Sequence, residues 1–489
     1  MNQTNVRLLA ISAVLLALGG CMVGPKYTKP PAPVPQAFKE PPPEGWKEAQ
    51  PSDGVLKGKW WEVYNDPDLN ALEEQVSISN QNVLAAEAQF RAAKDAIRIA
   101  RAALFPTIGA GASASNSRGA TSGLSGGSSS ASGLGRNTLV FPSLSLAWEP
   151  DLWGSIRRSV NASVDTAQAS ASQLENVRLL FQSELAVAYF NLHGIDGDTD
   201  LLERTAKSYE EYLTLTKNRY AGGIATGGDV AQAETQLATT QAQLLDVGVA
   251  RAQYEHAIAI FTGKPPASLT IARKILTVPP PAIPVVVPSA LLERRPDISA
   301  LERQMAAANE QIGIAQAAYY PNITLSASAG LQGSSLLNLF NWPSRFWSVG
   351  PGLSETIFDA GRRRCVLKQA QDLFDVNVAN YRQSVLTAFQ QVEDNLSTLR
   401  ILEEESKATA RAVDAAERSL TISTAQYKGG TASYLQVITT QAIALQNERT
   451  AIDILTRRLT SSVQLIQALG GGWDASTLPS ATTLRFTGK

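Results

Sequence analysis

The chain has 489 residues, and its 43 Lys and Arg residues almost balance its 44 Asp and Glu residues. This balance argues against nucleic-acid binding, which needs a basic face. With only two His, two Cys and three Met residues, the chain is poor in the ligands of a metal site, and nothing in it activates a serine beside a histidine. The sequence therefore predicts no enzyme activity, no cofactor and no metal site.

The first 20 residues have the pattern of a bacterial signal peptide. Arg7 precedes an apolar run from Leu8 to Leu18, which is too short to span a membrane as a helix. The run leads into Gly19-Gly20-Cys21, which resembles the acylation site of a lipoprotein precursor. We predict that the mature protein begins at Cys21 with a covalent lipid; an ordinary signal peptide with an incidental cysteine is the alternative. Met22 follows in place of an aspartate, which favours delivery to the outer membrane.

Residues 21–64 are rich in proline and are expected to form an extended tether, because proline fixes φ and removes a backbone donor. A first structural repeat is expected over residues 65–263. Its predicted elements are a helix at about 69–104, strands at about 107–116 and 139–149, and helices at about 155–219 and 229–262. Alternating apolar side chains indicate the strands, and long stretches without proline indicate the helices.

Residues 264–296 are expected to form a linker, and a second repeat is expected over residues 297–469. Its predicted elements are strands at about 322–332 and 346–357 and helices at about 362–427 and 434–469, before a tail at 470–489. The two copies keep the same spacing, since 207 positions separate Gly154 from Gly361 and also Gly222 from Gly429. A repeat of this length predicts one structure built from two similar halves.

Each predicted strand has about ten residues, which is the length that crosses a bilayer when a strand is tilted. Ile323, Leu325 and Ala327 alternate with Thr324 and Ser326; a small soluble hairpin with the same periodicity is the alternative. Four strands are too few to close a barrel, which needs about eight. The last helix carries an apolar residue at every seventh position, which indicates supercoiled partners. Both features predict that several copies of the chain assemble together.

Each long helix begins after a turn that runs from an aspartate to a glycine and is followed by arginines. The residues are Asp151, Gly154, Arg157 and Arg158 in the first copy, and Asp359, Gly361, Arg362, Arg363 and Arg364 in the second. Positive charge in the first turn opposes the helix dipole. The arginines are therefore either a solvated helix end or a group that lies near lipid phosphates. On the second interpretation, these residues form the junction between membrane and periplasm.

Each long helix ends in a Tyr-x-Gly-Gly sequence, where glycine permits the left-handed backbone of a tight turn. The residues are Tyr220, Gly222 and Gly223 in the first copy, and Tyr427, Gly429 and Gly430 in the second. They are predicted to mark the tips of two helical hairpins.

A run of three alternating aspartates, Asp196, Asp198 and Asp200, resembles the start of a calcium loop. Leu201 and Lys207 stand where such a loop needs glycine and glutamate. We interpret the run as a helix bend with solvated carboxylates.

Taken in order, these and other short motifs resemble outer-membrane efflux proteins of the TolC/OprM type, in their lipoprotein subgroup. The motifs are Cys21-Met22-Val23-Gly24-Pro25-Lys26-Tyr27, Trp60-Trp61, Phe105-Pro106, Trp148-Glu149-Pro150-Asp151-Leu152-Trp153-Gly154, Arg294-Arg295-Pro296-Asp297-Ile298, Tyr320-Pro321, Phe358-Asp359-Ala360-Gly361 and Ala468-Leu469-Gly470-Gly471-Gly472-Trp473. The resemblance implies a mixed α and β membrane protein. Three chains, each giving four strands, would close a twelve-stranded outer-membrane β-barrel that continues as a twelve-helix periplasmic α-barrel.

The resemblance also implies a location and a function. The protein would be lipid-anchored in the outer membrane of a Gram-negative bacterium and extend into the periplasm. It would passively conduct small molecules such as drugs, in a homotrimer joined to a periplasmic adaptor protein and an inner-membrane pump of the proton-driven type. A duct for protein secretion and a periplasmic coiled-coil lipoprotein scaffold without a pore are the alternatives.

In this family the periplasmic hairpin tips close the duct and contact the adaptor. The matching positions imply a gate at Asp229, Tyr434, Leu435, Gln436 and Thr439. Gln436 and Thr439 stand where relatives often have aspartates. We therefore expect a gate that relies on apolar and polar contacts more than on charge repulsion.

Overall fold

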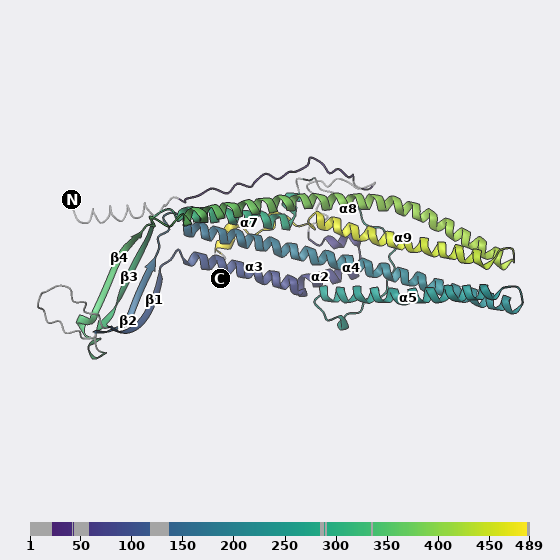
Figure 1. Ribbon diagram of the computed structural model, residues 1–489, viewed down its shortest axis with the longest axis horizontal. Coiled ribbons are helices and arrows are strands. Elements are labelled where there is room, and N and C mark those ends of the chain that lie inside the picture. Colours follow the sequence, from purple (N-terminus) through teal and green to yellow (C-terminus); the bar gives the residue numbers. More distant parts are fainter. Residues whose placement is uncertain are drawn as a thin grey trace.

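Figure 1 shows an elongated molecule, with a β-sheet at one end and a long bundle of helices that occupies the rest. The structure, a computed structural model, describes residues 22–41, 43, 58–117, 136–283, 288, 291–333 and 336–486. The predicted signal peptide and Cys21 lie outside these residues, as does the whole connection between the first two strands, residues 118–135.

The sheet has four strands in the order β1-β2-β3-β4, and every pair is antiparallel. Strand β1 spans Thr107–Ser117, β2 Arg136–Trp148, β3 Asn322–Gly333 and β4 Arg345–Ser354. The register of β2 against β3 shifts between Val140 and Ser143. Pro142 lies inside this shift. Proline has no backbone N–H to donate to the neighbouring strand, and within sheets it is therefore confined to such irregular positions or to edges. Pairing of β2 with β3 joins the two repeats in one sheet.

Two helical hairpins make up most of the bundle. In the first, α4 (Ser155–Ala221) packs along α5 (Gly227–Phe261), and in the second, α8 (Arg362–Lys428) packs along α9 (Tyr434–Ala468). Helices α4 and α8 each have 67 residues, which corresponds to about 100 Å. Their equal length and the constant offset of 207 positions support an internal duplication.

Shorter elements pack around the half of the bundle nearer the sheet. They are α2 (Pro67–Ser79), α3 (Gln81–Ala102), α6 (Leu291–Arg294), α7 (Pro296–Ala317) and α10 (Ala481–Phe486), with 3-10 turns η2 (Trp60–Tyr64) and η7 (Ala475–Thr477). A third turn, η3 (Pro266–Ser268), follows α5 and packs against it, whereas η5 (Leu336–Asn338) and η6 (Trp342–Ser344) belong to the connection between β3 and β4. The single helix expected at 69–104 is divided at Asn80. The Asn80 side chain accepts hydrogen bonds from the backbone N–H groups of Asn82 and Val83 and so caps α3.

The largest apolar core lies where α4, α7, α8 and α9 meet. Its buried members include Leu185, Tyr189, Leu192, Met305, Val385, Val392, Val463 and Ile466. Other apolar side chains of the helices stay exposed in the single chain, such as Leu245, Val376 and Ile422. Exposed apolar side chains along a helix indicate surfaces that pack against another chain or against lipid.

Candidate functional site

The sheet has one apolar face and one face of small polar residues. Side chains alternate between the faces of a strand, so each row of paired residues lies on one face. One row across the four strands consists of Ile108, Leu146, Ala327 and Val349. The next row, on the opposite face, consists of Gly109, Ser145, Ser328 and Ser348. Ile108 is 71% and Val349 61% exposed, so no described part of the chain covers this face. This division suits a sheet that has lipid on one side and water on the other.

The sheet also has two open edges. Among the described strands, β1 pairs only with β2, and β4 pairs only with β3. The outer edges of β1 and β4 therefore present backbone groups that pair with no other described strand. Each such group costs several kcal/mol in hydrocarbon, so the sheet needs further strands to enter a membrane.

At the two sheet–helix junctions, an aspartate caps each long helix. Asp151 accepts the backbone N–H of Arg157 at 2.8 Å and its Nε–H at 3.0 Å. Asp359 does the same for Arg363, at 3.1 and 2.8 Å. Gly154 begins its helix with φ of 80° and Gly361 with 84°, a conformation that favours glycine. The carboxylates offset the positive charge that the helix dipole disfavours.

The remaining arginines of the junctions differ from one another. Arg362 and Arg364 are exposed. Arg158 is 1% exposed, and its side chain pairs with Glu310 of α7 at 3.0 Å. The prediction that Arg158 lies near lipid phosphates is therefore wrong, because the side chain is enclosed within the chain.

At the far end of the bundle, the two hairpin tips contact each other. Arg219 Nη1 donates to the backbone carbonyl of Tyr427 at 2.6 Å, and its guanidinium lies 4.5 Å from the centre of the Tyr427 ring. Gly223 and Gly430 have φ of 74° and 77° and form the reversals. Arg219 is not among the residues predicted from the sequence, although the two copies differ visibly at this position, with Arg219-Tyr220 in the first and Gln426-Tyr427 in the second.

The residues predicted to form a gate have three different environments. Asp229 accepts the backbone N–H of Thr226 at 2.8 Å in a capping box at the start of α5. Tyr434 is 2% exposed and packs against Tyr427, and burial raises the pKa of its hydroxyl to about 12. The others, Leu435, Gln436 and Thr439, are exposed on one side of α9. The exposed group is free to face other chains, whereas Tyr434 is an internal contact of the tip.

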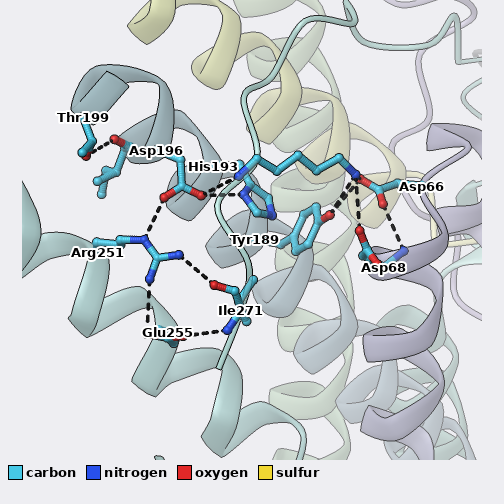
Figure 2. Close-up of polar contacts among 11 residues, drawn as sticks. Asp66, Asp68, Tyr189, His193, Asp196, Thr199, Arg251, Glu255 and Ile271 are labelled. Atoms are coloured by element: carbon cyan, nitrogen blue, oxygen red, sulfur yellow. Dashed lines mark hydrogen bonds and ion pairs between the residues drawn. The ribbon is translucent and has the colours of Figure 1, made fainter. Parts of the chain in front are cut away.

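A buried polar network joins the linker to the helices in the middle of the molecule (Figure 2). Its centre is Asp196 of α4, whose carboxylate accepts from His193 Nδ1 at 2.9 Å, from Arg251 Nε at 2.7 Å and from the backbone N–H of Lys274 at 3.1 Å. Arg251 of α5 also donates to the Ile271 carbonyl. Burial opposes ionisation of Asp196, but the bonds from His193 and Arg251 outweigh it, and the pKa of this carboxyl is lowered.

The network continues to the start of α2. Lys274 Nζ lies 2.7 Å from Asp66 Oδ2, which also accepts the hydroxyl of Tyr189 at 2.8 Å. Two segments far apart in the sequence, the cap of α2 and the linker, are thereby attached to one face of α4.

The interpretation of the aspartate run as a solvated helix bend is wrong for two of its three members. Helix α4 continues through the run. The Asp196 side chain is 1% exposed, and Asp198 forms a two-point ion pair with Arg449 of α9. Only Asp200 has an exposed pair, with Arg204. The carboxylates of Asp196 and Asp198 connect α4 to α5 and α9.

Within the described ranges, no cluster of three or more His, Cys, Asp or Glu side chains is arranged to hold a metal ion. None of the helices in this part of the chain is both long and apolar enough to span a membrane.

Comparisons with known proteins agree with this architecture. The family described as outer membrane efflux protein matches residues 72–264 and 287–471, and so covers both repeats. The toluene efflux pump outer membrane protein TtgF of Pseudomonas putida is 31% identical over 471 residues, which cover 94% of this chain and 96% of TtgF. The outer membrane protein OprJ of Pseudomonas aeruginosa is 30% identical over 472 residues, covering 95% and 96% of the two chains.

Among solved structures, the outer-membrane channel OprN matches with a TM-score of 0.83 and 28% identity, covering 93% of this chain and 100% of OprN. The matches extend over sheet and helices together. The chain therefore belongs to the outer membrane efflux protein family, and it is an outer-membrane channel of an efflux pump, in a family of ducts rather than of enzymes.

Proposed function

We propose that three copies of the chain close a single duct through the outer membrane, with a twelve-stranded β-barrel continued by a twelve-helix α-barrel in the periplasm. The amphipathic sheet with two open edges carries this proposal. Pairing of β1 with β4 of the next chain satisfies both edges, and three sheets of four strands exceed the minimum of about eight for a closed barrel. The Ser and Gly face would line the lumen, and the apolar face would contact lipid.

The length of the helices supports a periplasmic part of the duct. A hairpin of about 100 Å cannot bury its exposed apolar side chains alone, whereas lateral packing in a ring covers them. We further propose a covalent lipid on Cys21, a periplasmic adaptor at the hairpin tips around Tyr220 and Tyr427, and an inner-membrane pump of the proton-driven type. Arg362 and Arg364, which are exposed at the junction, remain the candidates for contact with lipid phosphates.

The cargo is proposed to be small organic molecules. Relatives are named for toluene, solvent and antibiotic efflux, and the row Gly109, Ser145, Ser328 and Ser348 on the proposed lumen face consists of neutral and small residues. Conduction would be passive, because energy is supplied by the pump.

Two measurements on the lipidated protein test this function. Purified protein in planar bilayers should give discrete conductance steps, and deletion of its gene should increase the susceptibility of the host to organic solvents and antibiotics. Absence of any conductance would exclude a pore. Conductance without a change in susceptibility, combined with loss of a secreted protein, would replace small-molecule efflux by protein secretion.

A further inference from the structure

The first described residues of the chain, 22–41, lie against the surface of the helical bundle. We call residues 22–41 the N-terminal strap. It runs in extended form along α7 and α8 (Figure 1). At its beginning, the backbone N–H of Val23 donates to the Trp153 carbonyl at 3.1 Å. Farther along, the Tyr27 hydroxyl donates to Glu302 of α7 at 2.8 Å, and Phe38 packs edge-to-face against Phe389 of α8.

One buried arginine binds the start of the strap. Arg158 Nε donates to the Val23 carbonyl at 2.5 Å, Nη2 donates to the Pro25 carbonyl at 3.2 Å, and Nη1 pairs with Glu310 at 3.0 Å. Asn309 donates to the same Pro25 carbonyl at 3.2 Å. A guanidinium has five N–H donors and no acceptor. Because Arg158 is buried, its Nε and Nη2 groups need acceptors besides Glu310, and the carbonyls of Val23 and Pro25 supply them.

The surfaces around Arg158 are shaped by glycines. A Cβ at Gly313 would overlap the Arg158 side chain. Gly24 has φ of +109°, and a Cβ there would lie 2.6 Å from the Gly313 Cα atom. At Gly154, where φ is +80°, a Cβ would lie 2.7 Å from Met22 Cγ. The strap, the start of α4 and α7 therefore approach one another more closely than a residue larger than glycine at these three positions would allow.

The internal duplication provides a comparison within the same molecule. The offset of 207 positions between α4 and α8 places Cys365 where the first copy has Arg158, and Cys365 is exposed. Helix α3 has 22 residues, as α7 does, and end-to-end alignment sets Asp95 opposite Glu310 and Arg98 opposite Gly313. Asp95 and Arg98 form an exposed ion pair with each other. The fold alone therefore does not require the buried arginine, since its second copy lacks it.

We propose that Arg158, Glu310 and Gly313 form a docking site for residues 22–27 of the same chain, and that Arg158 is the positioning residue of this site. The site fixes the N-terminus beside the sheet–helix junction. The consequence for membrane anchoring rests on the proposed lipid at Cys21, because docking of Met22 would hold the acylated residue beside this junction.

Cleavage by trypsin at the Lys26–Tyr27 bond tests the site. Lys26 is exposed, but a protease needs several residues on each side to leave the surface, so the cleavage rate follows the undocked population. The assembled, detergent-solubilised protein is treated with trypsin, and loss of the N-terminal peptide is followed by mass spectrometry. The variants are Arg158→Met and Gly24→Ala. Gly58→Ala and Arg157→Met serve as controls, because Gly58 has φ of +93° with open space around it and Arg157 bonds Asp151.

Gly24→Ala and Arg158→Met should each increase the cleavage rate about tenfold or more, which corresponds to about 1.4 kcal/mol, while the controls keep the wild-type rate. Arg158→Lys should give an intermediate rate, because one ammonium cannot reach all three acceptors. Gly24→Ala alters only the strap, so the unfolding temperature of the remaining chain should not change. Unchanged protection in Gly24→Ala would overturn the proposal, even if Arg158→Met fails to fold. The cleavage rate is independent of conductance, so a protein without a pore that shows this pattern would contradict the proposed duct and leave the docking site standing.

Discussion

At the scale of single residues, Asp196 and Arg158 are two charged side chains that are buried beside partners far away in the sequence. Asp196 and Arg158 were both assigned to solvent or lipid because charged residues are rarely buried unless they are paired. Their partners, Arg251 and Glu310, lie 55 and 152 positions away. No local pattern identifies such partners, so burial became visible only with the tertiary structure.

The two outer aspartates of the run provide a matched test of this difference. Asp196→Asn removes the central charge of the buried network and leaves Arg251 without its main partner, which costs about 3–5 kcal/mol for a buried pair. Asp200→Asn breaks an exposed pair with Arg204 and should change stability by less than about 0.5 kcal/mol. Thermal unfolding of the solubilised protein measures both. Equal effects of the two substitutions would show that the network does not stabilise the fold.

Glu73 of α2 should make stability depend on pH. It is fully buried, and neither carboxylate oxygen has a hydrogen-bond partner in the described part of the chain. Burial raises the pKa of Glu73 well above its ordinary value, and it also raises the pKa of the neighbouring Tyr64, which stays neutral. Because the folded state keeps a proton that the unfolded chain releases above about pH 4.3, stability falls as pH rises from that value to the folded pKa.

Glu73→Gln removes this titration. The variant should match the wild type near pH 4 and exceed its unfolding temperature at pH 8 by a few degrees, about 2–4 °C. The control is Glu74→Gln, which changes an exposed residue that pairs with Lys59. Its unfolding temperature should not rise above that of the wild type between pH 4 and pH 8. A wild type that gains stability relative to Glu73→Gln between pH 4 and pH 8 would contradict the assignment.

The proposed gate has one residue that is suited to a direct test. Leu435 is 58% exposed at the hairpin tip, whereas Tyr434 beside it is buried in its own chain. If three copies of Leu435 narrow the duct, Leu435→Ala should increase the conductance of the closed state in planar bilayers. Gln436→Ala, one position along α9, is the control for removal of a polar side chain. Unchanged conductance in Leu435→Ala would exclude this residue from the gate.

At the scale of elements, periodicity and proline positions were informative. The long helices begin and end within about two residues of the expected positions, because Gly154, Gly361 and the Tyr-x-Gly-Gly turns mark their ends. The division of the first helix at Asn80 was not predicted. An asparagine in a continuous helical pattern carries a weak signal, and only the side-chain cap reveals the break.

Close packing of α4 against α9 is the element-scale feature most open to measurement. A Cβ at Gly194 would overlap the Thr456 side chain, whereas Gly248 of α5 has nothing within 4 Å of such an atom. Gly194→Ala should therefore destabilise the protein by about 1–3 kcal/mol, as overpacked sites do. Gly248→Ala should stabilise it by about 0.5–1 kcal/mol through helix propensity. Chemical denaturation of the two variants checks the contrast, and stabilisation by both would contradict the close contact.

At the scale of the whole molecule, the sequence predicted the internal duplication, the alternating strands and the need for several copies. The open edges of β1 and β4, and an apolar sheet face that no described residue covers, support the prediction that several copies assemble. The docked strap was not predictable, since proline content indicates an extended chain but does not indicate what it contacts.

The central claim is that three chains close one duct, and the mass of the native assembly tests it most directly. Lipidated protein extracted from outer membranes in mild detergent should give, by native mass spectrometry, a species of three times the mass of one mature chain. Because an open sheet cannot enter lipid with its edges unpaired, monomers should be absent from correctly inserted material. A stable monomer, dimer or tetramer as the main membrane-extracted species would contradict the account.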